Sequence, residues 1–250
     1  MVNPVAAEFR KALTLPSVLI TIGLSIVAIA GLGVMAANSA SRQEPSYTAG
    51  FEVAAACVVG IVVLAVFIMS SEYTPNSKEA GAGRQIAVSL TSVPQRGSLF
   101  AAKAVVVAAL TGALATIVVL ATVLVAQVVL GDRATGYVEA LGHLGWRIPG
   151  AIAYGVCTGL ITFAITVVTR SGVIPLILVI VNSTVVSVSY LLTKVTPLAK
   201  YLPDVAGAQA FAYNYAAENM LDPLAGGLVM AGWTAVLLAV AGWTFHRRDA

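Results

Sequence analysis

The chain has 250 residues, of which 59% are hydrophobic and 10% charged, and its mean hydropathy is +0.92. A soluble domain carries about 25% charged residues, so this composition leaves too little polar surface to cover a water-soluble fold. The formal net charge of +3 comes without a basic tract and gives no reason to expect nucleic acid as a partner. Because lipid cannot satisfy the backbone groups of open strands, the sequence predicts an all-α membrane protein.

The chain begins with a predicted amphipathic helix, residues 3–14, which lies in the cytoplasmic interface before the chain turns into the membrane at Pro16. One face of this helix is apolar and the other is charged. The apolar face holds Val5, Phe9, Ala12 and Leu13, and the charged face holds Glu8, Arg10 and Lys11.

Six apolar segments follow, each near the roughly 20 residues that a helix needs to cross about 30 Å of hydrocarbon. They are residues 16–37, 50–70, 104–130, 148–169, 173–192 and 223–245, within a single transmembrane domain that covers 1–250. The first is longer than the roughly 7–15 apolar residues of a signal peptide and is predicted to be retained. Arg170–Gly172 is predicted to form a tight cytoplasmic hairpin between the fourth and fifth spans.

The basic residues favour one orientation. With both termini in the cytoplasm, most of the 14 Lys and Arg residues fall on the inner side. The predicted location is the bacterial plasma (inner) membrane, with the chain crossing it several times.

Two segments outside the spans are unusual. In the longest cytoplasmic loop, 72–103, Ile86, Leu90 and Val93 share one face of a short predicted helix. This helix either offers its polar side to a partner or anchors the loop in the interface. Residues 193–222 are apolar and aromatic but too broken to span, which favours a re-entrant external element over an ordinary interfacial aromatic belt.

Motifs for catalysis are missing. The sequence has no GxxxxGK[ST] loop, and no His, Cys and carboxylate residues have metal-ligand spacing. His143 and His246 are isolated, and Cys57 and Cys157 lie in apolar runs, typical of buried thiols. We therefore assign no catalytic, cofactor-binding or metal-binding residue, and a membrane enzyme is disfavoured.

Small and polar residues within the spans have two interpretations. The stripe of Thr158, Thr162, Thr166 and Thr169 on the fourth span either lines a cavity or makes helix–helix hydrogen bonds, as threonine commonly does in membranes. The same choice holds for the polar residues of the fifth span, which are candidates to line a cavity for an amphipathic substrate: Asn182, Ser183, Ser187 and Tyr190. Two motifs with small residues four apart indicate close helix contacts: Gly155-x-x-x-Gly159 and Ala108-x-x-x-Gly112.

Several separated features, taken in order, resemble the permease subunits of type-2 ABC transporters, especially small actinobacterial ones. They are Glu8-Phe9-Arg10-Lys11, Ser71-Glu72-Tyr73, Leu90-Thr91-Ser92-Val93-Pro94-Gln95-Arg96, Ala101-Ala102-Lys103, Thr169-Arg170-Ser171, Leu202-Pro203 and Arg247-Arg248-Asp249. The pattern departs from the family at residues 73–78, which continue into a longer loop than the compact "EYR-x-G-T" run of that family. The family pattern therefore does not fix the residue at which a coupling helix begins.

The resemblance implies a six-span permease that pairs with a second permease, identical or not, and binds two separately encoded ATPase subunits. ATP and Mg would be bound by those partners and not by this chain. The resemblance also implies an ATP-driven exporter of an amphipathic drug, lipid or peptide, whose path is lined by the first, second and fifth spans. A sensor or immunity module with little transport, or a stand-alone secondary transporter, are the alternatives.

The resemblance carries over to particular residues. Those expected to couple to the ATPase are Phe9, Arg10, Lys11, Arg84, Ile86, Leu90, Pro94 and Arg96, with the coupling helix at about 84–93. Those expected to form an external gate are Pro197, Tyr201, Leu202 and Pro203. Arg84, Arg96 and Lys103 are expected to hold the loop against an acidic ATPase surface or anionic lipid headgroups.

Overall fold

The structure is a computed structural model that describes residues 3–40, 46–54, 58–73, 95–182, 188–212 and 221–247. The described residues form helices joined by turns, without strands. The larger helices are α1 (Pro4–Thr14), α2 (Pro16–Ser39), α4 (Val58–Ser70), α6 (Arg96–Leu130), α7 (Tyr137–Leu144), α8 (Arg147–Thr169), α9 (Val173–Ile180) and α12 (Pro223–Arg247). Shorter elements are η1 (Ser46–Thr48), α3 (Phe51–Ala54), η3 (Ser71–Tyr73), η5 (Gly131–Arg133), α10 (Val188–Thr193), η7 (Pro197–Tyr201) and α11 (Pro203–Ala208).

Five segments of the described chain are long and apolar enough to cross a membrane. They are Pro16–Ser39, Ser46–Tyr73, Arg96–Arg133, Arg147–Thr169 and Pro223–Arg247. The prediction of an all-α, multi-pass membrane protein is therefore confirmed. The predicted span at 173–192 is not among the five. Its described parts are α9 and α10, and residues 183–187 between them lie outside the described residues.

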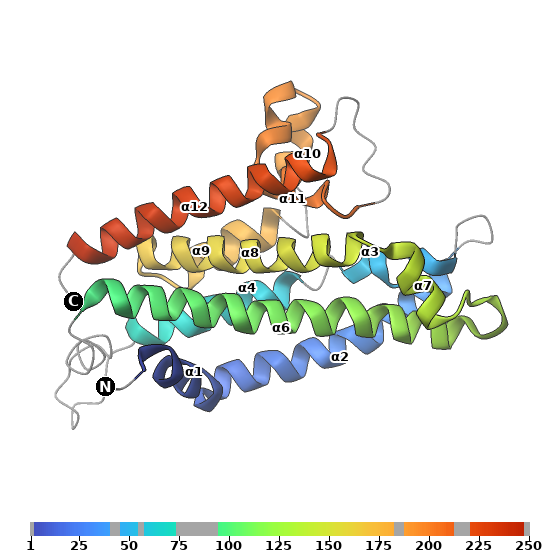
Figure 1. Ribbon diagram of the computed structural model, residues 1–250, viewed down its shortest axis with the longest axis horizontal. Helices are drawn as coiled ribbons and strands as arrows, with labels where there is room; N and C mark the ends of the chain where they lie inside the picture. Colours follow the sequence, from blue (N-terminus) through green and yellow to red (C-terminus); the bar gives the residue numbers. More distant parts are fainter. Residues whose placement is uncertain are drawn as a thin grey trace.

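The long helices lie side by side, and α6 runs along the middle of the bundle (Figure 1). It packs against α2, α4, α8 and α12, while α8 also packs against α4 and α12. The core between them is apolar, with Leu64, Leu99 and Phe163 fully buried. Much of α2 faces outward, where Leu24 and Val27 are 65% and 70% exposed, as expected for a helix that contacts lipid.

Glycines let α6 and α8 approach closely, as the small-residue motifs predicted. A Cβ at Gly159 would lie 2.7 Å from Thr111 Cγ2, and a Cβ at Gly112 would lie 3.2 Å from Val156 Cγ2. For Thr162 and Thr166, in the middle of the threonine stripe on α8, the structure fits neither interpretation. The hydroxyls of Thr162 and Thr166 donate to carbonyls one turn earlier in the same helix, at 2.7 and 2.8 Å. Both side chains are fully buried, so they do not line a cavity.

The helices place their ends at two distinct ends of the bundle. At one end, α1 lies beside the start of α6, and the start of α6 also meets the end of α12, where Phe100 and Phe245 have ring centroids 5.8 Å apart. The end of α8 is also here, because a Cβ at Gly172 would lie 3.3 Å from Ser70 Cβ. The start of α12 is at the opposite end, so residues 170–222 carry the chain back along the bundle (Figure 1).

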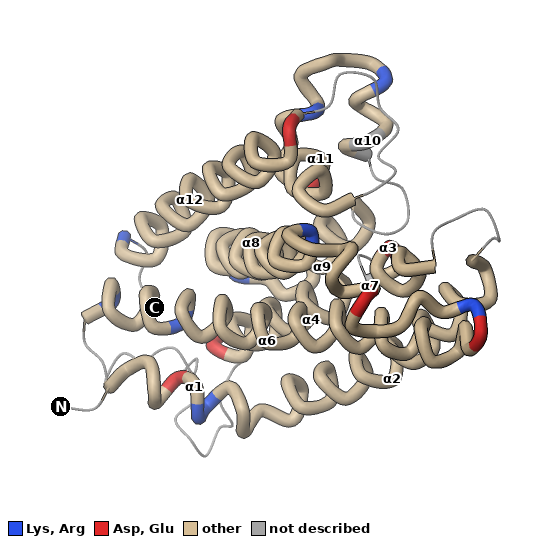
Figure 2. Tube along the Cα trace, turned by 45° about the vertical axis from the view of Figure 1, so that its right-hand side comes forward, with Lys and Arg blue, Asp and Glu red and all other residues tan. Residues whose placement is uncertain are grey.

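Charged residues gather near the helix ends, and the middle of the bundle is almost free of them (Figure 2). The turn between α8 and α9 agrees with the predicted hairpin. Arg170 takes a left-handed conformation with φ of 51°, and its N–H donates to Thr166 O at 2.9 Å, which ends α8.

The helix α6 begins earlier than the sequence suggested. It starts at Arg96, so residues 96–103, predicted to belong to a cytoplasmic loop, are helical. The physical reason is that Leu99, Ala102 and Lys103 continue the buried face of the helix. A lysine interrupts this face in the sequence, but it is buried in the structure by pairing with acids from other elements.

Candidate functional site

Four charged side chains from three elements meet at the α1 end of the bundle, and we call them the ion-pair cluster. Lys103 Nζ of α6 lies 2.6 Å from Glu8 Oε2 of α1 and 2.7 Å from Glu72 Oε1 of η3. Lys11 of α1 pairs with the same oxygen of Glu72. Glu72 therefore accepts hydrogen bonds from two lysines, and Lys103 donates to two carboxylates.

The centre of the cluster is removed from solvent. The side chains of Glu72 and Lys103 are 0% and 1% exposed, while those of Glu8 and Lys11 are 11% and 24% exposed. Burying an ion costs several kcal/mol unless partners with good geometry offset that cost. The alternation of two acids and two bases supplies such partners, so the cluster holds α1, η3 and α6 together.

The ion-pair cluster corrects the predicted orientation of α1. The sequence placed Glu8 and Lys11 on a face opposite to Ala12, but in the structure these residues share the face that meets the bundle. Residues three and four apart lie on one side of a helix, so Glu8, Lys11 and Ala12 fall together. Leu13, predicted on the apolar face, is 40% exposed.

Lys103 was expected to face an ATPase surface or lipid headgroups, and this expectation is wrong. Its side chain is buried and committed to Glu8 and Glu72. The sequence did carry a signal, since Leu99, Lys103, Val106 and Leu110 follow helical spacing. A lysine at an apolar position of a helix requires an acid from elsewhere in the fold, and a sequence does not say which one.

The structure describes four of the eight predicted coupling residues. Phe9 is half-buried against the core, whereas Arg10 is exposed on the outer side of α1. Arg96 is half-buried at the first position of α6, at the same end of the bundle. The others lie outside the described residues: Arg84, Ile86, Leu90 and Pro94. Phe9, Arg10, Lys11 and Arg96 thus lie at the end where residues 74–94 leave η3 and rejoin α6.

At the opposite end, the part of the predicted re-entrant element that the structure describes packs onto α8 and α12. We call residues 197–212 the docked segment. Within it, Val205 and Ala206 of α11 are 1% and 0% exposed. A Cβ at Gly150 of α8 would lie 2.7 Å from Ala210 O, so the two backbones are in close contact.

Two side chains bind the backbone of the docked segment. Arg147 Nη1 at the start of α8 donates to Phe211 O and Ala212 O, at 3.2 and 2.9 Å. Trp233 Nε1 of α12 donates to Tyr201 O at 2.8 Å. The sequence could not predict these contacts, because every acceptor is a backbone carbonyl.

The predicted gate residues belong to this segment. Pro197 and Pro203 begin η7 and α11, where proline's fixed φ suits a first helical position. Tyr201 is 43% exposed, and Leu202 is half-buried.

Of the predicted path-lining residues, Asn182 links two elements. Its Nδ2 donates to Asp204 Oδ2 of α11 at 2.7 Å, and its Oδ1 accepts from the N–H and the hydroxyl of Ser189, both at 3.2 Å. The amide therefore ties the chain after α9 to α10 and to the docked segment. Ser183, Ser187 and the side chain of Tyr190 lie outside the described residues.

Within the described residues, no group of three or more His, Cys, Asp and Glu side chains could hold a metal ion. His143 stacks on Tyr47, with ring centroids 4.8 Å apart, and Cys157 is a free thiol.

No protein-family model matches the sequence, and no curated protein matches it.

Proposed function

We propose that this chain is the membrane-spanning subunit of an ATP-driven ABC exporter, with a path for an amphipathic drug, lipid or peptide. Its sequence features resemble those of type-2 ABC permeases, and it has no phosphate-binding loop of its own. The structural observation that carries the proposal is the ion-pair cluster. It joins α1 to the two elements, η3 and α6, between which residues 74–94 run.

The cluster gives a physical route for coupling. Residues 74–94 are continuous with η3 on one side and α6 on the other, so a force on them acts on both elements. Because Glu72 and Lys103 are both bound to α1, that force also reaches the start of α2. Partner ATPases that close on ATP would then move several spans together, as packed helices shift between two arrangements.

The proposed topology has six crossings and both termini in the cytoplasm. The five long helices and the return of the chain over residues 170–222 support it, since α1 and the end of α12 lie at the same end of the bundle. That end carries Arg10, Arg96, Arg170 and Arg247, in keeping with a cytoplasmic side. The partners in this proposal are two ATPase subunits and a second permease, in the bacterial plasma membrane.

The deciding experiment is to express the chain with ATPase subunits encoded beside it, purify the complex and reconstitute it in vesicles. We expect co-purification, ATP hydrolysis stimulated by transported amphiphiles, and ATP-dependent movement of those compounds. Uphill movement of a solute by the chain alone would contradict the proposal in favour of a secondary transporter. A complex that hydrolyses ATP without transport would instead support a sensor or immunity module.

Variants test where the coupling occurs. We expect Arg96→Ala and Leu90→Ala to lower the amount transported per ATP hydrolysed while leaving membrane insertion intact. Arg133→Ala, an exposed position in η5 at the opposite end, is the matched control and should transport normally. Unchanged transport per ATP in the Arg96 and Leu90 variants would count against coupling through this end.

A further inference from the structure

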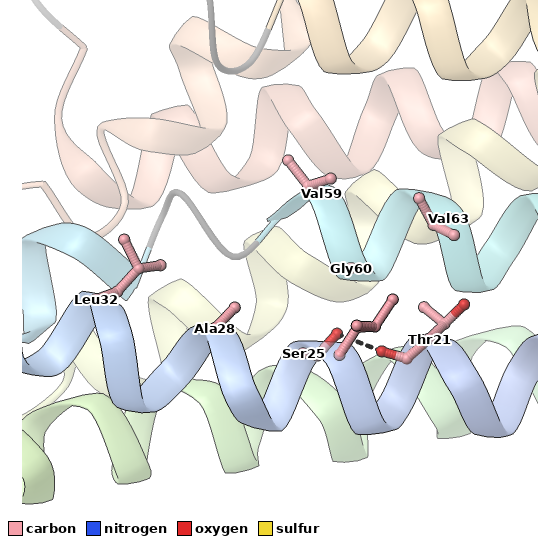
Figure 3. Close-up of a pocket in the computed structure, with 8 residues that line it drawn as sticks. Thr21, Ser25, Ala28, Leu32, Val59, Gly60 and Val63 are labelled. Atoms are coloured by element: carbon pink, nitrogen blue, oxygen red, sulfur yellow. Dashed lines mark hydrogen bonds between the residues drawn. The ribbon is translucent and has the colours of Figure 1, made fainter.

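A pocket of about 230 Å³ lies between α2 and α4 and shares no lining residue with the ion-pair cluster or the docked segment (Figure 3). Its walls come from two helices of the bundle. It is lined by Thr21, Leu24, Ser25, Ala28 and Leu32 of α2 and by Val59, Gly60 and Val63 of α4.

The walls offer no free hydrogen-bond donor. The Thr21 hydroxyl donates to Ser17 O at 2.7 Å, and the Ser25 hydroxyl donates to Thr21 O at 2.8 Å (Figure 3). Both donors are used within α2, and the remaining lining side chains are aliphatic. A polar ligand would lose its own hydrogen bonds on entering, so the pocket suits an apolar occupant.

The pocket opens on the outer side of α2. Leu24 and Ala28 are exposed at its rim, and they continue the exposed apolar surface formed by Ile20 and Val27. At Gly60 the two helices meet, because a Cβ there would contact Ser25 Oγ. The small residues Gly60 and Ala28 thus leave space beside a helix contact, and this space is continuous with the surface that would face hydrocarbon.

We propose that this pocket binds a segment of a phospholipid acyl chain from the surrounding bilayer. An empty pocket would leave its wall atoms without dispersion partners, and water gains nothing from apolar walls. An apolar cavity of about 150 Å³ stays dry and accepts a molecule the size of benzene, so this larger pocket has room for several methylene groups. The proposal requires that the exposed face of α2 contacts the bilayer, and it does not depend on transport.

The test uses phosphatidylcholine that carries a diazirine in the middle of one acyl chain. The full chain is reconstituted with this lipid and irradiated, and the labelled peptides are mapped by mass spectrometry. We expect labels on Val59 and Val63, which line the pocket from α4, at a level several-fold above that on buried residues of α4 such as Val62. Label distributed equally over α4, or absent from it, would overturn the proposal.

Variants that fill the pocket separate binding from general lipid contact. Ala28→Phe should reduce labelling of Val59 and Val63 several-fold. Ala30→Phe is the matched control on the same helix, because Ala30 is exposed but does not line the pocket, and it should leave labelling unchanged. If Ala28→Phe does not give a monodisperse protein, Val63→Phe fills the pocket from α4 and should reduce labelling of Val59.

A second copy of the chain is the competing occupant. Cysteine replacements at Leu24 and Ala28, at the rim of the pocket, test for this. Efficient disulfide formation between copies, together with loss of the lipid label on Val59 and Val63, would overturn the proposal in favour of a dimer contact.

Discussion

The two ends of the bundle are held together by different kinds of contact. At the α1 end, four charged side chains pair with one another and bridge α1, η3 and α6. They belong to Glu8, Lys11, Glu72 and Lys103. At the other end, the docked segment touches α8 and α12 through closely approaching backbones at Gly150 and Gly226. An ion-pair cluster is directional and loses much of its energy when one member is removed. A glycine contact is steric and fails when an atom is added.

The largest effect is expected from removing the shared cation of the ion-pair cluster. Lys103→Met removes the lysine that pairs with Glu8 and one of the two lysines that pair with the buried Glu72. Breaking a buried pair by removing one partner costs about 3–5 kcal/mol, because a buried charge is left uncompensated. We expect a loss of this order in the free energy of unfolding, measured by titration with a denaturing detergent.

A double variant checks that the loss comes from the pairing of Lys103 with Glu72. Combining Lys103→Met with Glu72→Gln removes a positive and a negative charge together. The double variant should be more stable than the sum of the two single losses predicts, because contacting residues couple. Additive losses would show that Lys103 and Glu72 do not stabilise the fold through each other.

At the other end, an added methyl group should disrupt the contact between the docked segment and α12. A Cβ at Gly226 would collide with the backbone oxygen of Ala206, which cannot rotate away as a flexible side chain could. Overpacking of this kind costs about 1–3 kcal/mol. Gly226→Ala should therefore lower the thermal midpoint of unfolding.

The adjacent glycine is a matched control. Among the residues that the structure describes, a Cβ at Gly227 would meet Ala210 Cβ at 4.0 Å, an ordinary contact. In the same helix, Gly227→Ala should raise stability by up to about 1 kcal/mol, the usual helix preference of alanine over glycine. Equal behaviour of the two variants would contradict the close packing of the docked segment.

The smallest effect is expected for an exposed ion pair. Glu139 Oε1 and His143 Nε2 are 3.8 Å apart, and their side chains are 67% and 51% exposed. Exposed pairs of this spacing contribute about 0.3–0.5 kcal/mol at most. Glu139→Gln should leave the thermal midpoint nearly unchanged. A loss as large as that of Lys103→Met would mean that burial does not explain the strength of the ion-pair cluster.

Much of the fold could be predicted from apolar length alone. The first, fourth and last predicted spans match α2, α8 and α12 to within a few residues, because each is bounded by polar residues or proline. Prediction was weaker where a boundary depends on a partner. The prediction missed the start of α6 at Arg96 because a lysine at position 103 is typical of a loop. Its pairing with Glu8 and Glu72, which allows it to be buried, is visible only in the structure.

The candidate site was predicted in part. The sequence predicted Lys11 and Arg96 on the same side of the spans. In the structure both residues lie at the α1 end of the bundle. The direction in which α1 faces could not be read from the sequence. A helix with both apolar and charged residues has more than one face that could meet the bundle. The pairing that decided between them involves Lys103, almost a hundred residues further along the chain.

The sequence by itself determined that this chain forms apolar helices suited to a bilayer, because hydrophobic length and the absence of internal charge are local properties. Only the tertiary structure decided which charges are buried, which glycines are contacts, and which side of α1 faces inward. These outcomes depend on pairs of residues far apart in sequence. The free-energy cost of burying Lys103 depends on the carboxylates that pair with it. The space for a Cβ at Gly226 depends on the backbone oxygen of Ala206.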